Sequence, residues 1–218
     1  MSYTGNVTVG GPAGVHELAK LIISKAAVGP MENNAYLLRC RETGEQLLID
    51  AAAEPATLLS LIGGDGITGV VTTHRHPDHW QALDEVVRAT GARTYAGRYD
   101  AEAIPVATDV LVEDGDEIRV GTCRLTARHL VGHTPGSIAL VYDDPDGHPH
   151  VFTGDCLFPG GVGNTRGDAA AFTRLLHDVE TKLFAALPDE TWIYPGHGAD
   201  TTLGTERPHL QEWRERGW

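Results

Sequence analysis

The sequence predicts a four-layer α/β protein in which two mixed sheets pack face to face and helices cover their outer faces. Short runs rich in Val, Ile and Leu recur along the whole 218-residue chain, as the strands of two sheets would. Segments with apolar residues at helical spacing occur in both halves of the chain. No linker, internal repeat or low-complexity stretch interrupts this pattern, so we expect one domain over residues 1–218.

The first half alternates strands with two helices. Strands are expected at residues 16–24, 34–40, 45–51 and 68–74. The second and third form a hairpin around the turn at 42–44, and the fourth is rich in β-branched residues, as a strand buried on both faces is. Helices are expected at 54–64, before two glycines, and at 77–91, between Pro77 and Gly91.

The second half begins with strands and ends with helices. Two strands joined by a turn at Gly121 are expected within 116–130, and a hairpin with its turn at 145–149 is expected from 137–144 and 150–156. The longest helical pattern covers 168–187. A last strand at 191–197 and a closing helix at 207–216 complete the expected order.

The composition is typical of a globular protein and narrows the set of partners. No apolar run approaches the roughly 18 residues of a membrane-spanning helix, and the N-terminus lacks the pattern of a secretory signal. The net charge of −13 repels nucleic acid and anionic membranes, so we expect neither as a partner. The three cysteines form no CxxC pair and are expected to be buried thiols in the reducing cytoplasm. Oligomeric state is left open by the sequence.

Residues 70–80, "VVTTHRHPDHW", crowd three histidines and an aspartate behind an apolar strand pattern. In an extended segment, residues i and i+2 point the same way, so His74 and His76 can chelate one ion. Pro77 turns the chain and opens the helix, so Asp78 and His79 point elsewhere and suit a second ion. The alternative is an ordinary polar strand end, but the HxHxDH spacing favours metal binding.

Three further ligand candidates follow other strand candidates. His133 lies in the loop "GHTPGS", Asp155 in "TGDC" and His197 in "PGHG". Each alone is a common turn residue. Together and in this order they predict a site at one edge of the scaffold, because loops at strand ends are where rigid folds carry ligands. His129 is too far from His133 along an extended strand to chelate with it, and Cys156 is expected to be a packed thiol.

These residues can hold two divalent metal ions, with zinc expected and iron or manganese as alternatives. The expected metal ligands are His74, His76, Asp78, His79, His133, Asp155 and His197. His74, His76 and His133 can supply one ion, Asp78, His79 and His197 the other, and the two oxygens of Asp155 can bridge them. Two ions about 3.5–4 Å apart hold a shared water and lower its pKa, which makes a bridging hydroxide nucleophile.

The motifs "THRHPDH", "GHTPGS", "FTGDCLF" and "YPGHG" resemble those of the metallo-β-lactamase superfamily, and the likeness runs from about residue 32 to residue 198. The resemblance implies an αββα sandwich and the same division of the seven ligands between two metals. It further implies that Asp50 supports the metal-binding loop.

Within the superfamily the chain is most similar to glyoxalase II, the hydroxyacylglutathione hydrolases. It has Asn164 where glyoxalase II usually has an arginine, and it resembles the short, single-domain relatives. We therefore expect a hydrolase of a small-molecule thioester or related ester, with Asp155 bridging the metals and Asp78 relaying a proton. The alternatives are a persulfide dioxygenase-like enzyme with one iron, a lactonase on the same site, and a non-catalytic binding module.

Overall fold

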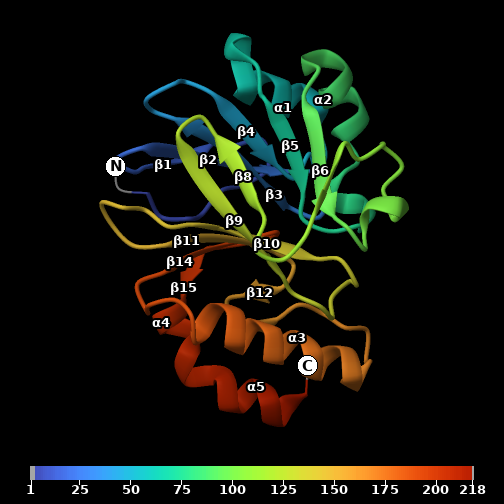
Figure 1. Ribbon diagram of the computed structural model, residues 1–218, viewed down its shortest axis with the longest axis vertical. Helices are drawn as coiled ribbons and strands as arrows, with labels where there is room; N and C mark the ends of the chain where they lie inside the picture. The colour runs from blue at the N-terminus through green and yellow to red at the C-terminus, as the bar shows by residue number, and fades with distance from the viewer. Residues whose placement is uncertain (1–2, 218) are drawn as a thin grey trace.

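The computed structural model describes residues 3–217 and arranges them as helices, sheet, sheet and helices (Figure 1). The first sheet has the order β1-β2-β3-β4-β5-β6-β7. Its strands are β1 Gly14–Glu17, β2 Leu21–Val28, β3 Asn33–Cys40, β4 Gln46–Ile49, β5 Gly69–Thr72, β6 Arg93–Gly97 and β7 Val110–Val112. Strands β1 to β4 pair antiparallel, whereas β4 to β7 pair parallel. The sheet is therefore mixed, as expected.

The second sheet has the order β15-β14-β11-β10-β9-β8. Its strands are β8 Glu117–Val120, β9 Cys123–His129, β10 Ile138–Tyr142, β11 His150–Gly154, β14 Trp192–Pro195 and β15 Thr201–Thr202, and a separate pair is formed by β12 Leu157–Phe158 and β13 Gly161–Val162. Only β11 and β14 pair parallel within this sheet, so their carboxyl ends lie at the same edge.

Three apolar clusters separate the four layers. The middle cluster joins the two sheets and contains Leu38, Val71 and Phe152. The upper cluster packs α1 Pro55–Ile62 and α2 Leu83–Thr90 on the first sheet, and the lower cluster packs α3 Ala169–Val179, α4 Leu203–Glu206 and α5 Leu210–Arg216 on the second (Figure 1). This is the αββα sandwich predicted from the sequence. Among residues 3–217, no helix has both the length and the apolar character needed to cross a bilayer.

Two expected elements are broken by local hydrogen bonds. The strand predicted at 16–24 is a tight hairpin, because Leu18 N–H donates to the carbonyl of Leu21 and the chain reverses between β1 and β2. The helix predicted at 77–91 is a 3₁₀ turn, Pro77–His79, followed by α2. The amides of Gln81 and Ala82 donate to the carbonyls of residues 52 and 51 instead of to the preceding turn.

Other differences are smaller. The helix expected at 168–187 is α-helical to Val179 and continues as a π-helical turn, Glu180–Phe184. Strands β6 and β7 lie in the stretch between residues 91 and 116, for which no element is expected from the sequence. Both strands are short, and β6 contains two small residues, so their apolar pattern is weak.

A buried ion pair fixes the N-terminal segment against the second sheet. The Lys25 side chain on β2 is fully buried, and its Nζ lies 2.6 Å from Asp200 Oδ1. Lys25 Nζ also donates to the carbonyls of Gly5 at 2.7 Å and Gly198 at 2.8 Å. Burial lowers the pKa of Lys25, whereas Asp200 raises it. All three donor positions of the ammonium group are thus used, one of them beside the loop that carries His197.

Replacing Lys25 by Met should lower the free energy of unfolding by roughly 3 kcal/mol, because the buried carboxylate of Asp200 then loses its ion-pair partner and keeps only the hydrogen bonds from Tyr3 and Trp192. Urea unfolding of the metal-loaded protein measures this difference. Lys20→Met is the matched control, since the Lys20 side chain is exposed. A Lys25→Met protein within about 0.5 kcal/mol of the control would contradict this account of the pair.

Candidate metal centre

Loops at the carboxyl ends of several strands meet at one edge of the sandwich and bring the seven predicted side chains together. His74, His76, Asp78 and His79 follow β5, and His133 lies between β9 and β10. Asp155 follows β11, and His197 follows β14. Three groups of ligand atoms lie within 4.8 Å of one another: His74, His76 and His133; Asp78, His79 and His197; and His74, His79 and Asp155.

Asp155 faces both histidine groups. Its Oδ2 lies 3.5 Å from His133 Nε2 and 3.6 Å from His197 Nε2. Its Oδ1 lies 3.4 Å from His79 Nε2. The carboxylate therefore lies between the two three-residue groups, where it could bridge a pair of ions.

The spacing of the ligand atoms suits metal–ligand bonds. Bonds of about 2.0–2.1 Å in a tetrahedron place neighbouring ligand atoms roughly 3.3 Å apart. His74 Nε2 and His76 Nδ1 are 3.0 Å apart, and Asp78 Oδ2 lies 3.5 Å from His79 Nε2 and 3.2 Å from His197 Nε2. Each group could thus hold one divalent ion.

Burial of unpartnered atoms gives an independent test of that fit. Within residues 3–217, His79 Nε2, His133 Nε2 and Asp155 Oδ1 are buried and make no hydrogen bond. Buried polar atoms are rarely left without a partner, because desolvation then costs about 1–3 kcal/mol each. Bound cations would give each of the three atoms a partner, so these residues fit a metal centre.

Hydrogen bonds to Nδ1 orient the histidines whose Nε2 points inward. His79 Nδ1 lies 2.8 Å from Asp50 Oδ2, His133 Nδ1 lies 2.9 Å from the Asn164 carbonyl, and His197 Nδ1 lies 2.9 Å from the Met31 carbonyl. An N–H at Nδ1 leaves the lone pair on Nε2, which is the form that binds a metal.

Asp50 orients His79 and also holds the start of the metal-binding loop. Its Oδ1 accepts from the amide of Thr73 at 2.8 Å, and its Oδ2 accepts from the Thr73 hydroxyl at 2.8 Å. The Asp50 side chain is buried, and its backbone adopts a left-handed conformation with φ of 59°. This is the supporting position that the sequence resemblance implies for Asp50.

The carboxylates in the cluster favour positive charge there. Burial lowers the pKa of His79, but the carboxylates of Asp50 and Asp155 outweigh it and raise the pKa to about 10. Burial lowers the pKa of His74, which lies among four other imidazoles. The hydrogen bond with His197 lowers the pKa of Asp78. The buried carboxylates thus favour positive charge at the position where a metal would bind.

Two asparagines at the start of β3 were not foreseen from the sequence. Asn33 Nδ2 donates to Asp78 Oδ2 at 2.9 Å, which orients this carboxylate. Asn34 Nδ2 donates to the carbonyls of Pro195 at 2.9 Å and Gly198 at 3.0 Å, on either side of His197. The signal available in the sequence is the pair of adjacent asparagines opening an otherwise apolar strand.

Asn164 has two contacts at the rim of the cluster. Its carbonyl meets His133, and its Oδ1 accepts from the amide of Arg166 at 2.7 Å. Arg166 has a left-handed backbone, and its Nη2 lies 3.4 Å from His76 Nε2. A metal on His76 Nδ1 would leave a proton on Nε2, so the guanidinium would then be free for another acceptor.

Gly196 leaves room for the carboxylate. A Cβ at this position would lie 2.2 Å from Asp155 Oδ1 and 2.8 Å from His79 Cε1, closer than side-chain atoms can approach. The glycine before His197 is therefore required by packing at the cluster.

The two residues expected to stay outside the cluster do so. The ring of His129 stacks on Tyr99, with ring centroids 5.3 Å apart, and its Nε2 lies 2.7 Å from the Pro135 carbonyl. The buried thiol of Cys156 lies 3.8 Å from the Leu130 carbonyl. Neither belongs to a group with metal-ligand spacing among the described residues.

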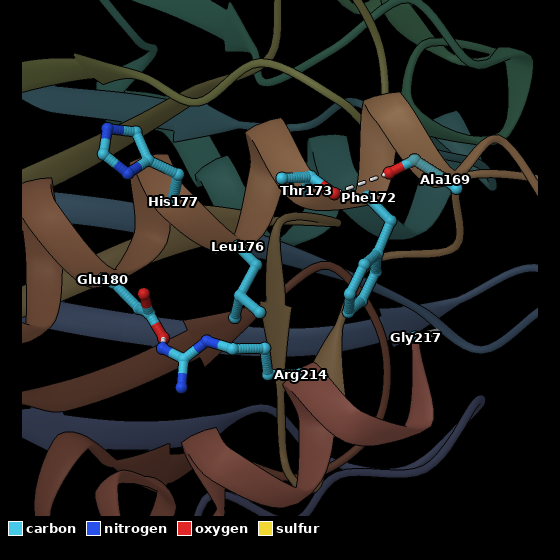
Figure 2. A pocket seen from close by; sticks show the side chains of 8 residues that line it. All are labelled: Ala169, Phe172, Thr173, Leu176, His177, Glu180, Arg214 and Gly217. Atoms are coloured by element: carbon cyan, nitrogen blue, oxygen red, sulfur yellow. Dashed lines mark hydrogen bonds and ion pairs between the residues drawn. The ribbon is translucent and has the colours of Figure 1, made fainter.

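A cavity of about 350 Å³ lies apart from the cluster, between α3 and α5 (Figure 2). Its described lining residues include Phe172, Leu176, His177 and the ion pair of Glu180 with Arg214, and none of the seven clustered side chains. The metal cluster has its own neighbouring cavity of about 300 Å³, lined by His133, Arg75 and Arg174.

The sequence is similar to that of known metalloproteins. The family model of the metallo-beta-lactamase superfamily matches residues 28–197. The chain is 38% identical over 169 residues to a hydroxyacylglutathione hydrolase of Polaromonas sp., covering 76% of this chain and 62% of that protein. It is 36% identical over 167 residues to the mitochondrial persulfide dioxygenase ETHE1 of Homo sapiens, covering 74% and 62%. The match thus spans less than two thirds of either relative.

The chain also resembles a solved structure in both fold and sequence. The structure of TTHA1623 in a di-iron-bound form superposes with a TM-score of 0.66 and is 32% identical, covering 84% of this chain and 96% of that one.

Replacing Asp50 by Asn should weaken metal affinity about 10- to 100-fold. The neutral amide of Asn lacks the negative charge with which the Asp50 carboxylate accepts the His79 N–H. Asn tolerates the left-handed backbone, so the fold should persist. Competition with a chromophoric chelator measures the affinity. Asp65→Asn, at an exposed surface ion pair, is the control. Equal affinities for the two variants would show that Asp50 does not support the site.

Proposed function

This chain belongs to the metallo-beta-lactamase superfamily, and from that premise we propose that it is a dinuclear metal-dependent hydrolase of a small-molecule thioester or related ester. The observation that carries the proposal is the carboxylate of Asp155 between two three-residue groups of ligand atoms. One group with a single open position would suit a mononuclear centre. Two groups that share one carboxylate suit a pair of ions.

We assign the ligands by the atoms that face inward. His74 Nε2, His76 Nδ1 and His133 Nε2 would hold one ion, and Asp78 Oδ2, His79 Nε2 and His197 Nε2 would hold the other, with Asp155 between the two groups. Imidazole and carboxylate ligands suit zinc, iron and manganese, and zinc is our first choice. The di-iron-bound structural relative supports a pair of ions.

Bound divalent ions supply a Lewis acid for the substrate carbonyl and a water whose pKa lies near neutrality. The chain's own residues then handle the proton. Asn33 holds Asp78 through Oδ2, which leaves Asp78 Oδ1 as the oxygen placed to relay a proton. The low pKa of Asp78 keeps it ionised at neutral pH, so it accepts a proton only transiently.

A thioester fits this proton inventory. The thiol of a departing group has a pKa near 8.5, so a thiolate leaves without a strong general acid. The clustered groups are aspartates that stay ionised and histidines whose lone pairs would bind the ions, so none of them is a strong acid. The positive charge of Arg166 beside His76 suits an anionic portion of the substrate at the rim. The hydroxyacylglutathione hydrolase relatives support the thioester class.

Two other activities are kept as rivals. The likeness to a persulfide dioxygenase favours an oxidoreductase with one iron on the first group of ligands. A lactonase would use the same proposed dinuclear centre on a different ester.

We also propose that the chain is one domain. We propose that it works in the cytoplasm, since Cys40, Cys123 and Cys156 are free and buried.

Metal analysis and a substrate panel on one preparation should separate these activities. We expect two zinc, iron or manganese ions per chain, and hydrolysis of thioesters faster than of lactones, with no oxygen uptake on a persulfide. One iron per chain together with oxygen consumption on a persulfide would replace the hydrolase by the dioxygenase.

Replacing Asp155 by Asn should lower kcat about 1,000-fold, because the amide cannot share a negative charge between two ions. Circular dichroism should show an unchanged fold. Asp116→Asn, in the exposed turn before β8, is the matched control. Thioester turnover by Asp155→Asn at the rate of this control would remove the bridging carboxylate from the mechanism.

A further inference from the structure

Two thiols from different sheets lie together at the end of β3 far from the metal cluster. Cys40 is the last residue of β3 in the first sheet, and Cys123 is the first residue of β9 in the second. Both are free and buried, with exposed fractions of 0% and 4%. At the other end of β3, Asn33 contacts Asp78 of the cluster.

The turn between β8 and β9 carries Cys123 against Cys40. A Cβ on Gly121 would lie 2.8 Å from Cys40 Sγ, and Thr122 Oγ1 lies 3.5 Å from the same sulfur. Cys123 Sγ lies 3.6 Å from the Lys20 carbonyl, and Lys20 precedes Leu21, the strand partner of Cys40. Both thiols belong to the middle apolar cluster, so they lie in the same layer between the two sheets and share neighbours there.

Their surroundings make the two thiols chemically unequal. Burial raises the pKa of Cys40, but hydrogen bonds from Thr122 and Thr43 outweigh it and bring the pKa to about 6. Burial, and then the neighbouring Cys40, raise the pKa of Cys123 to about 11. One thiolate beside one protonated thiol is the arrangement of an attacking and a resolving cysteine.

A small oxidant can enter beside Cys123 and Thr122, and the Thr122 hydroxyl lies 3.5 Å from Cys40 Sγ. Cys123 lines an open cavity of about 440 Å³, together with Lys20, Thr122 and Tyr142. The third thiol, Cys156, lies in the lower cluster under α3, and burial raises its pKa. It provides an internal comparison within the same molecule.

We propose that Cys40 and Cys123 form an oxidation site at which a peroxide joins the two sheets through a disulfide. The Cys40 thiolate attacks one oxygen of hydrogen peroxide and the O–O bond breaks. Hydroxide departs, and Cys40 becomes a sulfenic acid. The Cys123 sulfur then attacks the Cys40 sulfur, gives up its proton, and displaces the hydroxyl group as water. Two thiols are oxidised by two electrons, and one peroxide is reduced to two waters.

The cross-link would enclose residues 41–122, which carry His74, His76, Asp78 and His79, and leave His133, Asp155 and His197 outside. It joins the two halves that contribute the metal ligands. The site is separate from the proposed hydrolase activity, so either proposal stands if the other fails.

The test treats the zinc-loaded protein with a small excess of hydrogen peroxide and then alkylates it with iodoacetamide in guanidinium. We expect the monomer mass to fall by two hydrogen atoms, one thiol to alkylate instead of three, and peptide mapping to join Cys40 to Cys123. Alkylation of all three thiols after oxidation, a sulfinic acid on Cys40 without a link, or a link between two chains would each overturn the proposal.

Serine variants give matched controls for the same measurement. Cys40→Ser and Cys123→Ser should lose the link, whereas Cys156→Ser should form it as the unmodified protein does. The mapping on the unmodified protein decides the question if a variant does not fold. A link that includes Cys156 would also refute the assignment.

Discussion

Imidazole and carboxylate atoms that are buried without a protein partner are the constraint on which this structure depends. His79, His133 and Asp155 each direct such an atom into one small volume. Their desolvation is costly unless a cation binds there, and the carboxylates raise the affinity of that volume for positive charge. The surrounding contacts follow from this need. Asp50, Asn164 and the Met31 carbonyl hold the imidazoles so that their lone pairs converge.

The sandwich delivers these side chains because strand ends from both sheets meet at one edge. β5 brings the histidine-rich loop from the first sheet, and the parallel pair β11 and β14 brings Asp155 and His197 from the second. On β3, Asn33 donates to Asp78 from the first sheet, and Asn34 donates to the Pro195 carbonyl in the loop that carries His197 from the second. Gly196 permits the approach. The site therefore depends on how the two sheets pack, more than on any single motif.

The sequence predicted the layers and the seven clustered residues, since both leave local patterns. Apolar strands of four to eight residues followed by His or Asp are readable one at a time. The contacts of Asn33, Asn34 and Asn164 are not, because each depends on a partner more than 30 residues away. The break after His79 was also missed. There the amides of Gln81 and Ala82 find carbonyls in a neighbouring loop, which helical periodicity cannot reveal.

Anomalous X-ray scattering from a crystal of the metal-loaded protein would distinguish a pair of ions bridged by Asp155 from a mononuclear centre. We expect two peaks about 3.5–4 Å apart, one among His74, His76 and His133 and the other among Asp78, His79 and His197, with Asp155 contacting both. A single peak, or two peaks with Asp155 turned away from one of them, would contradict this expectation.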